Sequence, residues 1–213
     1  LAFGWVVSAN AMPITANGLE WLQPVDFINL SWNDISATCN PTTGACSGLL
    51  GTIDITGYTW ASLEDVNNLF NYYIGSPFPM GPGPDYVSSY LTATWANAFF
   101  ADGWLATQGS DAEGYTTLQA MVRDTEFEGG VTITRKGLIK NDFDLYSSDL
   151  VSTNQAIPIN IRSSTIGGWL YRNPETQLPV PIPATLPLLA LGLAALGYSR
   201  RKRKQHICYI VGT

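Results

Sequence analysis

The chain has 213 residues, the size of one domain with short addressing segments. Seventeen acidic but only six basic residues lie between Glu20 and Glu175, so this body carries a net charge of −11, which disfavours nucleic acid as a partner. Aromatic residues make up 12% of the chain and charged residues 13%, a mixture that argues against a disordered chain and is common in folded extracellular domains.

The first eleven residues form an apolar run that ends in small side chains at Ala9 and Ala11. This is the pattern of the late part of a secretory signal peptide, because small residues fit the subsites of signal peptidase. We therefore expect residues 1–11 to be a signal-peptide remnant and Met12 to be the mature start. A buried first strand over Leu1–Val7 is the alternative interpretation.

Residues 12–175 are expected to form an extracellular α+β domain. A strand is predicted over Gly18–Leu22, and helical spacing begins at Trp32 and stops before Pro41. Ser62 and Asp65 form a capping box, which predicts a helix that continues with its apolar face to Gly75.

A Gly/Pro loop follows the second predicted helix over residues 75–84, and a further helix is predicted from Tyr90 to Phe99. The second half alternates between apolar and polar residues, which favours strands over 115–123, 130–139 and 165–172. Two or three helices with an antiparallel sheet indicate an α+β fold, and a β-sandwich is the alternative.

Cys39 and Cys46 bracket a segment rich in turn-forming residues. In an oxidising compartment they are expected to form a disulfide. The alternative is a metal site, which is disfavoured because the body has neither a histidine nor a third cysteine. The remaining cysteine, Cys208, lies in the C-terminal segment.

The single histidine of the chain, His206, lies near the C-terminus, which excludes Ser-His-Asp and Cys-His catalysis from the body. A hydrolase that uses paired carboxylates remains an alternative. Its candidate acids are Glu64 with Asp65, Asp124 with Glu126 and Glu128, and Asp142 with Asp144. Acids this close in sequence are usually solvated loop or capping residues, so we expect a domain without catalytic activity.

Asp142, Asp144 and Asp149 alternate with other oxygen-bearing residues and form a weak candidate for a structural Ca²⁺ site. The segment lacks the glycine and the final glutamate of an EF-hand loop. No other metal and no cofactor is expected. Exposed Trp and Tyr side chains could stack on sugar rings, although most of the seven tryptophans are expected to fill the core.

The C-terminal segment, residues 176–213, has three parts. A proline-rich linker leads into 17 uncharged residues from Ile182 to Tyr198, at the short limit for a membrane-spanning helix. A basic run follows at residues 200–204 and is expected to stay on the cytoplasmic side. A buried amphipathic helix is the alternative, but the segment has no polar face.

These three parts together resemble the PEP-CTERM sorting signal of exported Gram-negative proteins. The residues that carry the resemblance are Val180, Pro181, Pro183, Ala184 and Thr185, then Arg200, Arg201, Lys202 and Arg203. The resemblance implies recognition by exosortase, removal of the tail and an association with exopolysaccharide. One departure is Ile182, where the family usually has Glu. A GPI signal would lack the basic run, and the Leu-Pro-x-Thr-Gly motif of cell-wall sorting signals is missing.

The body carries a second resemblance, to the ectodomains that accompany such tails and, distantly, to C-type-lectin-like domains. It rests on residues 17–22, 31–35, 57–70 and 166–172, which are mainly apolar framework. The two resemblances imply an exported, non-catalytic protein with exosortase, the membrane and extracellular polysaccharide as partners. Its expected location is a precursor tethered at the inner membrane, and then the cell surface or the extracellular matrix.

Overall fold

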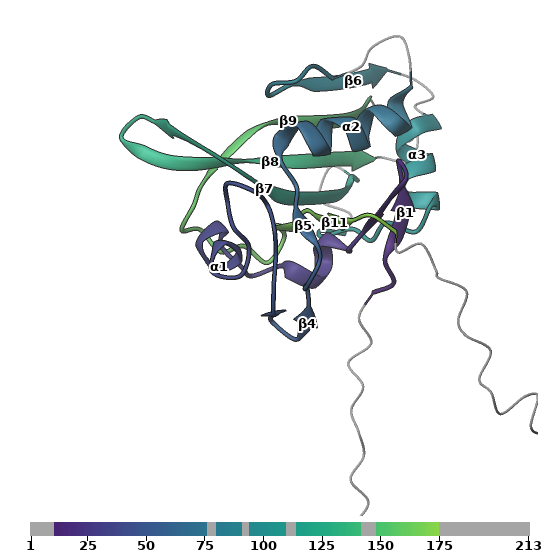
Figure 1. The fold of residues 1–213 in the computed structure, drawn as a ribbon. Coiled ribbons are helices and arrows are strands. Elements are labelled where there is room, and N and C mark those ends of the chain that lie inside the picture. The colour runs from purple at the N-terminus through teal and green to yellow at the C-terminus, as the bar shows by residue number, and fades with distance from the viewer. Residues whose placement is uncertain (1–10, 76–79, 91–93, 110–113, 142–147, 175–213) are drawn as a thin grey trace, which may run out of the picture. The chain divides into compact units, whose positions relative to one another are not determined.

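An antiparallel sheet of long strands lies at the centre of the fold in the computed structural model, which describes residues 11–75, 80–90, 94–109, 114–141 and 148–174. Its strand order is β10-β7-β8-β9-β6. The strands are β6 (Tyr86–Tyr90), β7 (Thr116–Glu128), β8 (Val131–Asn141), β9 (Ser148–Pro158) and β10 (Gly167–Gly168). The one parallel pair within this sheet is β10 with β7. Figure 1 shows β7 and β8 joined as a hairpin that extends beyond the helices.

A second sheet brings the first and last strands of the domain together. Its order is β1-β2-β11-β5, and all its described pairs are antiparallel. The strands are β1 (Ile14–Ala16), β2 (Leu19–Trp21), β5 (Thr59–Trp60) and β11 (Leu170–Arg172). A separate two-stranded ribbon consists of β3 (Leu49–Leu50) and β4 (Ile53–Asp54).

Capping boxes fix the starts of two helices. The Ser62 hydroxyl accepts from the Asp65 amide, and the Asp65 carboxylate accepts from the Ser62 amide at the start of α2 (Leu63–Ile74). Ser31 and Asp34 make the same exchange at the start of α1 (Trp32–Ser36). The other described helical elements are the 3-10 helix η1 (Pro24–Phe27) and α3 (Thr94–Ala101).

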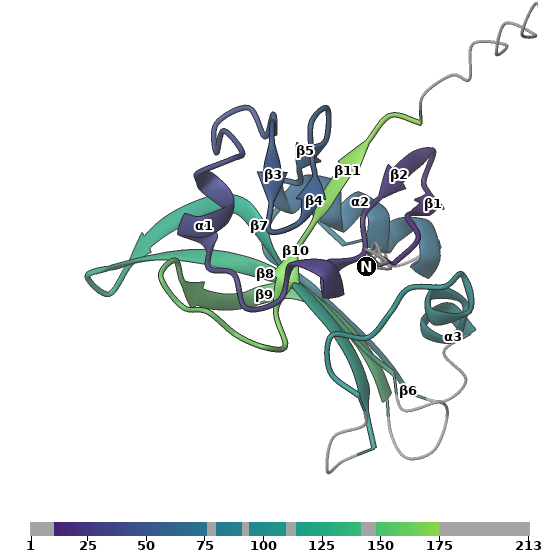
Figure 2. The same ribbon diagram turned by 90° about the horizontal axis from the view of Figure 1, so that it is seen from below.

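Two apolar clusters stabilise the domain. One lies between α2, α3 and the long sheet, whose arrangement Figures 1 and 2 show. Its members include Leu69, Phe70, Phe99 and Trp169. The other includes Phe27, Ile35 and Met121. Five of the six tryptophans in the described residues are buried, which confirms for these residues that tryptophans mainly fill the core.

The structure confirms an α+β arrangement and the predicted helix from the Ser62 capping box. The helix predicted from Tyr90 to Phe99 was wrong at its start, because Tyr90 ends β6 and α3 begins at Thr94. Strand β6 hydrogen-bonds with β9, a long-range pairing that overrides the helical spacing of Tyr90.

The proposed C-terminal helix and residues 1–10 of the signal-peptide remnant lie outside the described residues. Within the residues that are described, no helix is long and apolar enough to cross a membrane. The chain divides by its internal contacts into a unit that ends at Pro174 and a second unit from Glu175 to Thr213.

Candidate functional site

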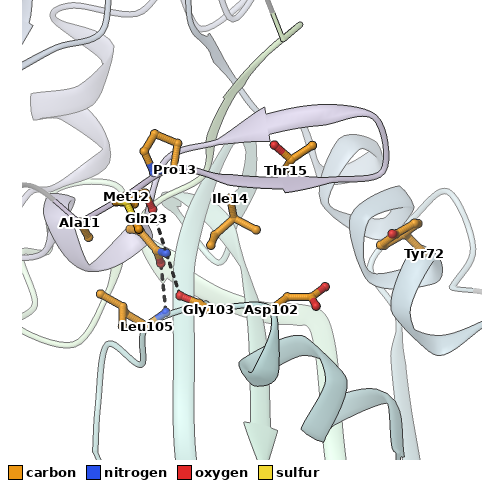
Figure 3. Close-up of a pocket in the computed structure, with 10 residues that line it drawn as sticks. All are labelled: Ala11, Met12, Pro13, Ile14, Thr15, Gln23, Tyr72, Asp102, Gly103 and Leu105. Atoms are coloured by element: carbon orange, nitrogen blue, oxygen red, sulfur yellow. Dashed lines mark hydrogen bonds between the residues drawn. The ribbon is translucent and has the colours of Figure 1, made fainter.

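A pocket of about 660 Å³ lies beside the N-terminal hairpin of the domain (Figure 3). Volumes of roughly 300–1,000 Å³ are usual for small-molecule sites. Its walls come from β1, the end of α2 and the turn after α3, which are distant in sequence. The lining residues are Ala11, Met12, Pro13, Ile14, Thr15, Gln23, Tyr72, Asp102, Gly103 and Leu105.

Gln23 holds two walls of the pocket together. Its side chain is 1% exposed, and its Nε2 donates to the carbonyls of Met12 (3.2 Å) and Gly103 (3.0 Å). Its Oε1 accepts from the amide of Leu105 at 3.0 Å. Figure 3 shows the amide between the β1 segment and the turn after α3. The pocket is thus preformed by a side chain whose hydrogen-bonding groups are all used.

The turn after α3 approaches β1 closely. Gly103 has a φ of +98°, and a Cβ at this position would lie 3.3 Å from Cδ1 of Ile14. Glycine meets both demands, because it tolerates positive φ and has no side chain to displace Ile14.

Asp102 is held by a chain of hydrogen bonds from the aromatic core. Nε1 of Trp104 donates to the Tyr73 hydroxyl at 3.0 Å, and that hydroxyl donates to Oδ2 of Asp102 at 2.9 Å. Burial, followed by the contact with Asp102, raises the pKa of Tyr73, so the phenol stays protonated and remains a donor. The hydrogen bond from Tyr73 therefore orients the carboxylate, and Asp102 remains exposed to solvent.

Three lining side chains keep hydrogen-bonding capacity. Within the described residues, the Thr15 hydroxyl, the Tyr72 hydroxyl and Oδ1 of Asp102 have no hydrogen-bond partner. The Tyr72 side chain is 56% exposed, and its ring lies edge-to-face with Tyr73 at 5.0 Å. The pocket thus combines an exposed aromatic ring with a carboxylate and two hydroxyls.

The predicted disulfide is present. Cys39 and Cys46 are joined, and both are buried, at 1% and 6% exposure. They pack in the cluster that contains Ile35 and Trp60. The metal-site alternative for this pair is therefore wrong, because neither sulfur is a free thiolate.

Four of the five described acids of the catalytic alternative have structural partners. Asp65 caps α2, and Asp124 accepts from the amide of Leu63 at the same helix start. Glu126 forms a two-point ion pair with Arg135, which also lies 3.9 Å from Glu128. The pairing with Arg135 lowers the pKa of Glu126, so this carboxylate stays ionised. The exposed Glu64 lies in the first turn of α2.

The calcium candidates are only partly described. Asp149 lies in β9 opposite Ser89 and is 2% exposed. Asp142 and Asp144 lie outside the described residues, as do the sorting-signal residues Val180 to Thr185 and Arg200 to Arg203. In the part of the chain that is described, no group of three His, Cys, Asp or Glu side chains is placed to hold a metal ion.

The sequence did not indicate Gln23, Tyr72 or Asp102 as site residues. Tyr72 does not share the helical spacing of the apolar residues Val66, Leu69 and Phe70 of α2. The sequence pattern therefore predicts only that Tyr72 faces solvent. The capping and strand patterns near these residues do not predict which segments come together at the pocket.

No family model, curated protein or solved structure matches this chain.

Proposed function

We propose that this chain is an exported, non-catalytic surface protein that exosortase processes through the C-terminal tail. The signal-peptide remnant directs residues 12–175 out of the cytoplasm, and the tail holds the precursor at the inner membrane. After processing, the domain works at the cell surface or in the matrix, in association with exopolysaccharide. Within the α+β class, we propose that the domain has a C-type-lectin-like fold, on the basis of the sequence resemblance.

The observation that carries this proposal is the disulfide between Cys39 and Cys46. Disulfides persist in oxidising compartments and are rare in the cytosol. Because this one lies inside an apolar cluster, it belongs to the folded core rather than to an exposed redox site. The two end segments of the sequence indicate export, and the structural disulfide in the body fits an oxidising compartment. Both observations therefore support a location outside the cytosol.

Processing is tested by replacing Pro181 and Pro183 with Ala in the native host. The expected result is an unprocessed, membrane-bound precursor, detected by intact-mass spectrometry of envelope and medium fractions. Pro179→Ala is the matched control, because it removes a proline from the same linker but leaves the sorting motif intact. Normal processing of the double variant would overturn the role of exosortase.

A secreted carbohydrate-active hydrolase is the alternative, and it has less support. It needs two carboxylates that face each other across a cleft. The described candidates Asp65, Asp124 and Glu126 are instead used in helix capping and ion pairing. Release of reducing sugar from the host's own polysaccharide, lost on substitution of one acid, would favour the hydrolase.

A further inference from the structure

We propose that the pocket between β1, the end of α2 and the turn after α3 binds a neutral sugar residue of a polysaccharide, with Tyr72 stacking on the ring and Asp102 accepting its hydroxyl groups. This inference rests on the proposed function and names the ligand class and its site.

The apolar side of the site consists of apolar side chains that the core does not bury. Eight large apolar side chains are exposed among the described residues, and three of them, Met12, Tyr72 and Leu105, line this pocket. The edge-to-face contact with Tyr73 holds the Tyr72 ring in place. A fixed, solvent-facing aromatic ring offers an apolar face for the C–H side of a sugar at a low entropic cost.

The polar side supplies acceptors and no cationic side chain. Oδ1 of Asp102 and the hydroxyls of Thr15 and Tyr72 can accept hydrogen bonds, and none of the described residues that line the pocket is a Lys or Arg. Hydrogen bonds from sugar hydroxyls to an ionised carboxylate are stronger than those between neutral groups. A carboxylate in a domain with a body charge of −11 repels uronates, sulfates and phosphates. The chemistry therefore favours a neutral sugar over an acidic one.

Hydrogen bonds already hold the walls of the pocket together before any ligand binds. The hydrogen bonds of Gln23 join the β1 segment to the turn after α3, and Trp104 and Tyr73 orient Asp102. Little ordering is left for the ligand to impose, which lowers the cost of binding.

The site lies close to the point where the chain leaves the domain. Thr15 of β1 pairs with Glu20 of β2, and Glu20 pairs with Arg172 at the end of β11. The Arg172 guanidinium binds the Glu20 carboxylate at 2.7 Å, which fastens this end of the sheet. With strands about 4.8 Å apart, Thr15 lies about 10 Å from the last strand before the tail. A polysaccharide bound here is held next to the tethered end of the domain.

The test is affinity electrophoresis of the purified protein in native gels that contain dextran, galactomannan, polygalacturonate or chitosan. We expect retardation by at least one of the two neutral polymers and none by polygalacturonate. Tyr72→Ala and Asp102→Asn should each weaken that retardation about tenfold, because the first removes the stacking ring and the second removes the charge that strengthens the hydrogen bonds. Unchanged melting temperatures are expected, since both side chains are exposed.

Matched controls lie outside the pocket. Tyr86→Ala removes a tyrosine that is 62% exposed on β6, and Glu64→Gln neutralises an exposed acid on α2. Both should bind like the wild type. Retardation by chitosan alone would show only the attraction of an acidic domain to a polycation. No retardation by either neutral polymer would show no such sugar site, and full binding by Tyr72→Ala would place the site elsewhere. Each outcome overturns the inference but leaves export and tail processing to their own test.

Discussion

The indole rings of Trp21 and Trp169 meet edge-to-face in the core, with centroids 6.1 Å apart and planes at 89°. Trp21 ends β2 near the start of the domain, whereas Trp169 lies between β10 and β11 near its end. Both rings are fully buried. Segments near the two ends of the domain therefore pack against each other in one core. This packing holds β2 in place, and with it the paired strand β1 that forms a wall of the pocket.

Gly137→Ala should destabilise the domain by about 1–3 kcal/mol, because overpacking of a tight core has costs of this size. A Cβ at this position would lie 2.6 Å from Cγ1 of Val66 and 2.7 Å from Nε1 of Trp169. Chemical unfolding in urea measures the change. Gly109→Ala is the control, since a Cβ there meets no atom within 4 Å. Equal stability of the two variants would show that β8 can shift away from α2.

Asn67→Ala should lower the free energy of unfolding by about 3 kcal/mol, because it leaves buried polar groups without partners. The Asn67 amide donates to the carbonyls of Gly81 (2.7 Å) and Gly83 (2.9 Å), and its Oδ1 accepts from Thr153 at 2.8 Å. These bonds fasten the Gly/Pro loop to α2 and β9. Asn68→Ala, at the next and exposed position, should change stability little in the same unfolding measurement. Similar losses for both variants would contradict this role of Asn67.

Replacing Cys39 and Cys46 together with Ser should cost about 2–3 kcal/mol, the chain-entropy value for a short loop. Thermal unfolding with and without a reductant measures the effect. The wild type should lose stability on reduction, whereas the double variant should not respond. A wild type that is indifferent to reductant would show that the bridge contributes nothing to stability.

Acid should weaken the domain through Asp34. Hydrogen bonds from Arg162 and then from Ser31 lower the pKa of Asp34 from 3.8 to about 2. Because the folded pKa is lowered, this contribution is complete above pH 3.8 and is lost as the pH falls toward 2. Asp34→Asn should be less stable than the wild type at pH 6, and the gap should close near pH 2.

Urea midpoints measured from pH 6 to pH 2 follow this change. Arg162→Gln checks the cause, since it removes the main partner of Asp34 but keeps the capping box with Ser31. It should reproduce much of the altered pH dependence. A constant gap between Asp34→Asn and the wild type across this range would rule out titration of Asp34 as the source.

Local signals in the sequence predicted the elements whose stabilising contacts are local. The box of Ser62 and Asp65 predicted the start of α2, because both hydrogen bonds join residues three positions apart. Cys39 and Cys46 were predicted to pair because they are close in sequence and have no competing partner in the body. The apolar spacing of Val66, Leu69 and Phe70 likewise predicted which face of α2 is buried.

Strands β6 and β9 were decided by tertiary structure. The β9 segment is rich in Ser, Thr, Asn and Gln, and the short β6 segment has two serines between Val87 and Tyr90. Both become strands because β9 hydrogen-bonds to β8 on one side and to β6 on the other. The pocket has the same origin. Thr15, Tyr72 and Asp102 come from three separate elements, and Gln23 and Gly103 join two of the walls 80 positions apart in sequence. Spacing within a turn or helix cannot encode such a meeting, because it depends on how whole elements pack.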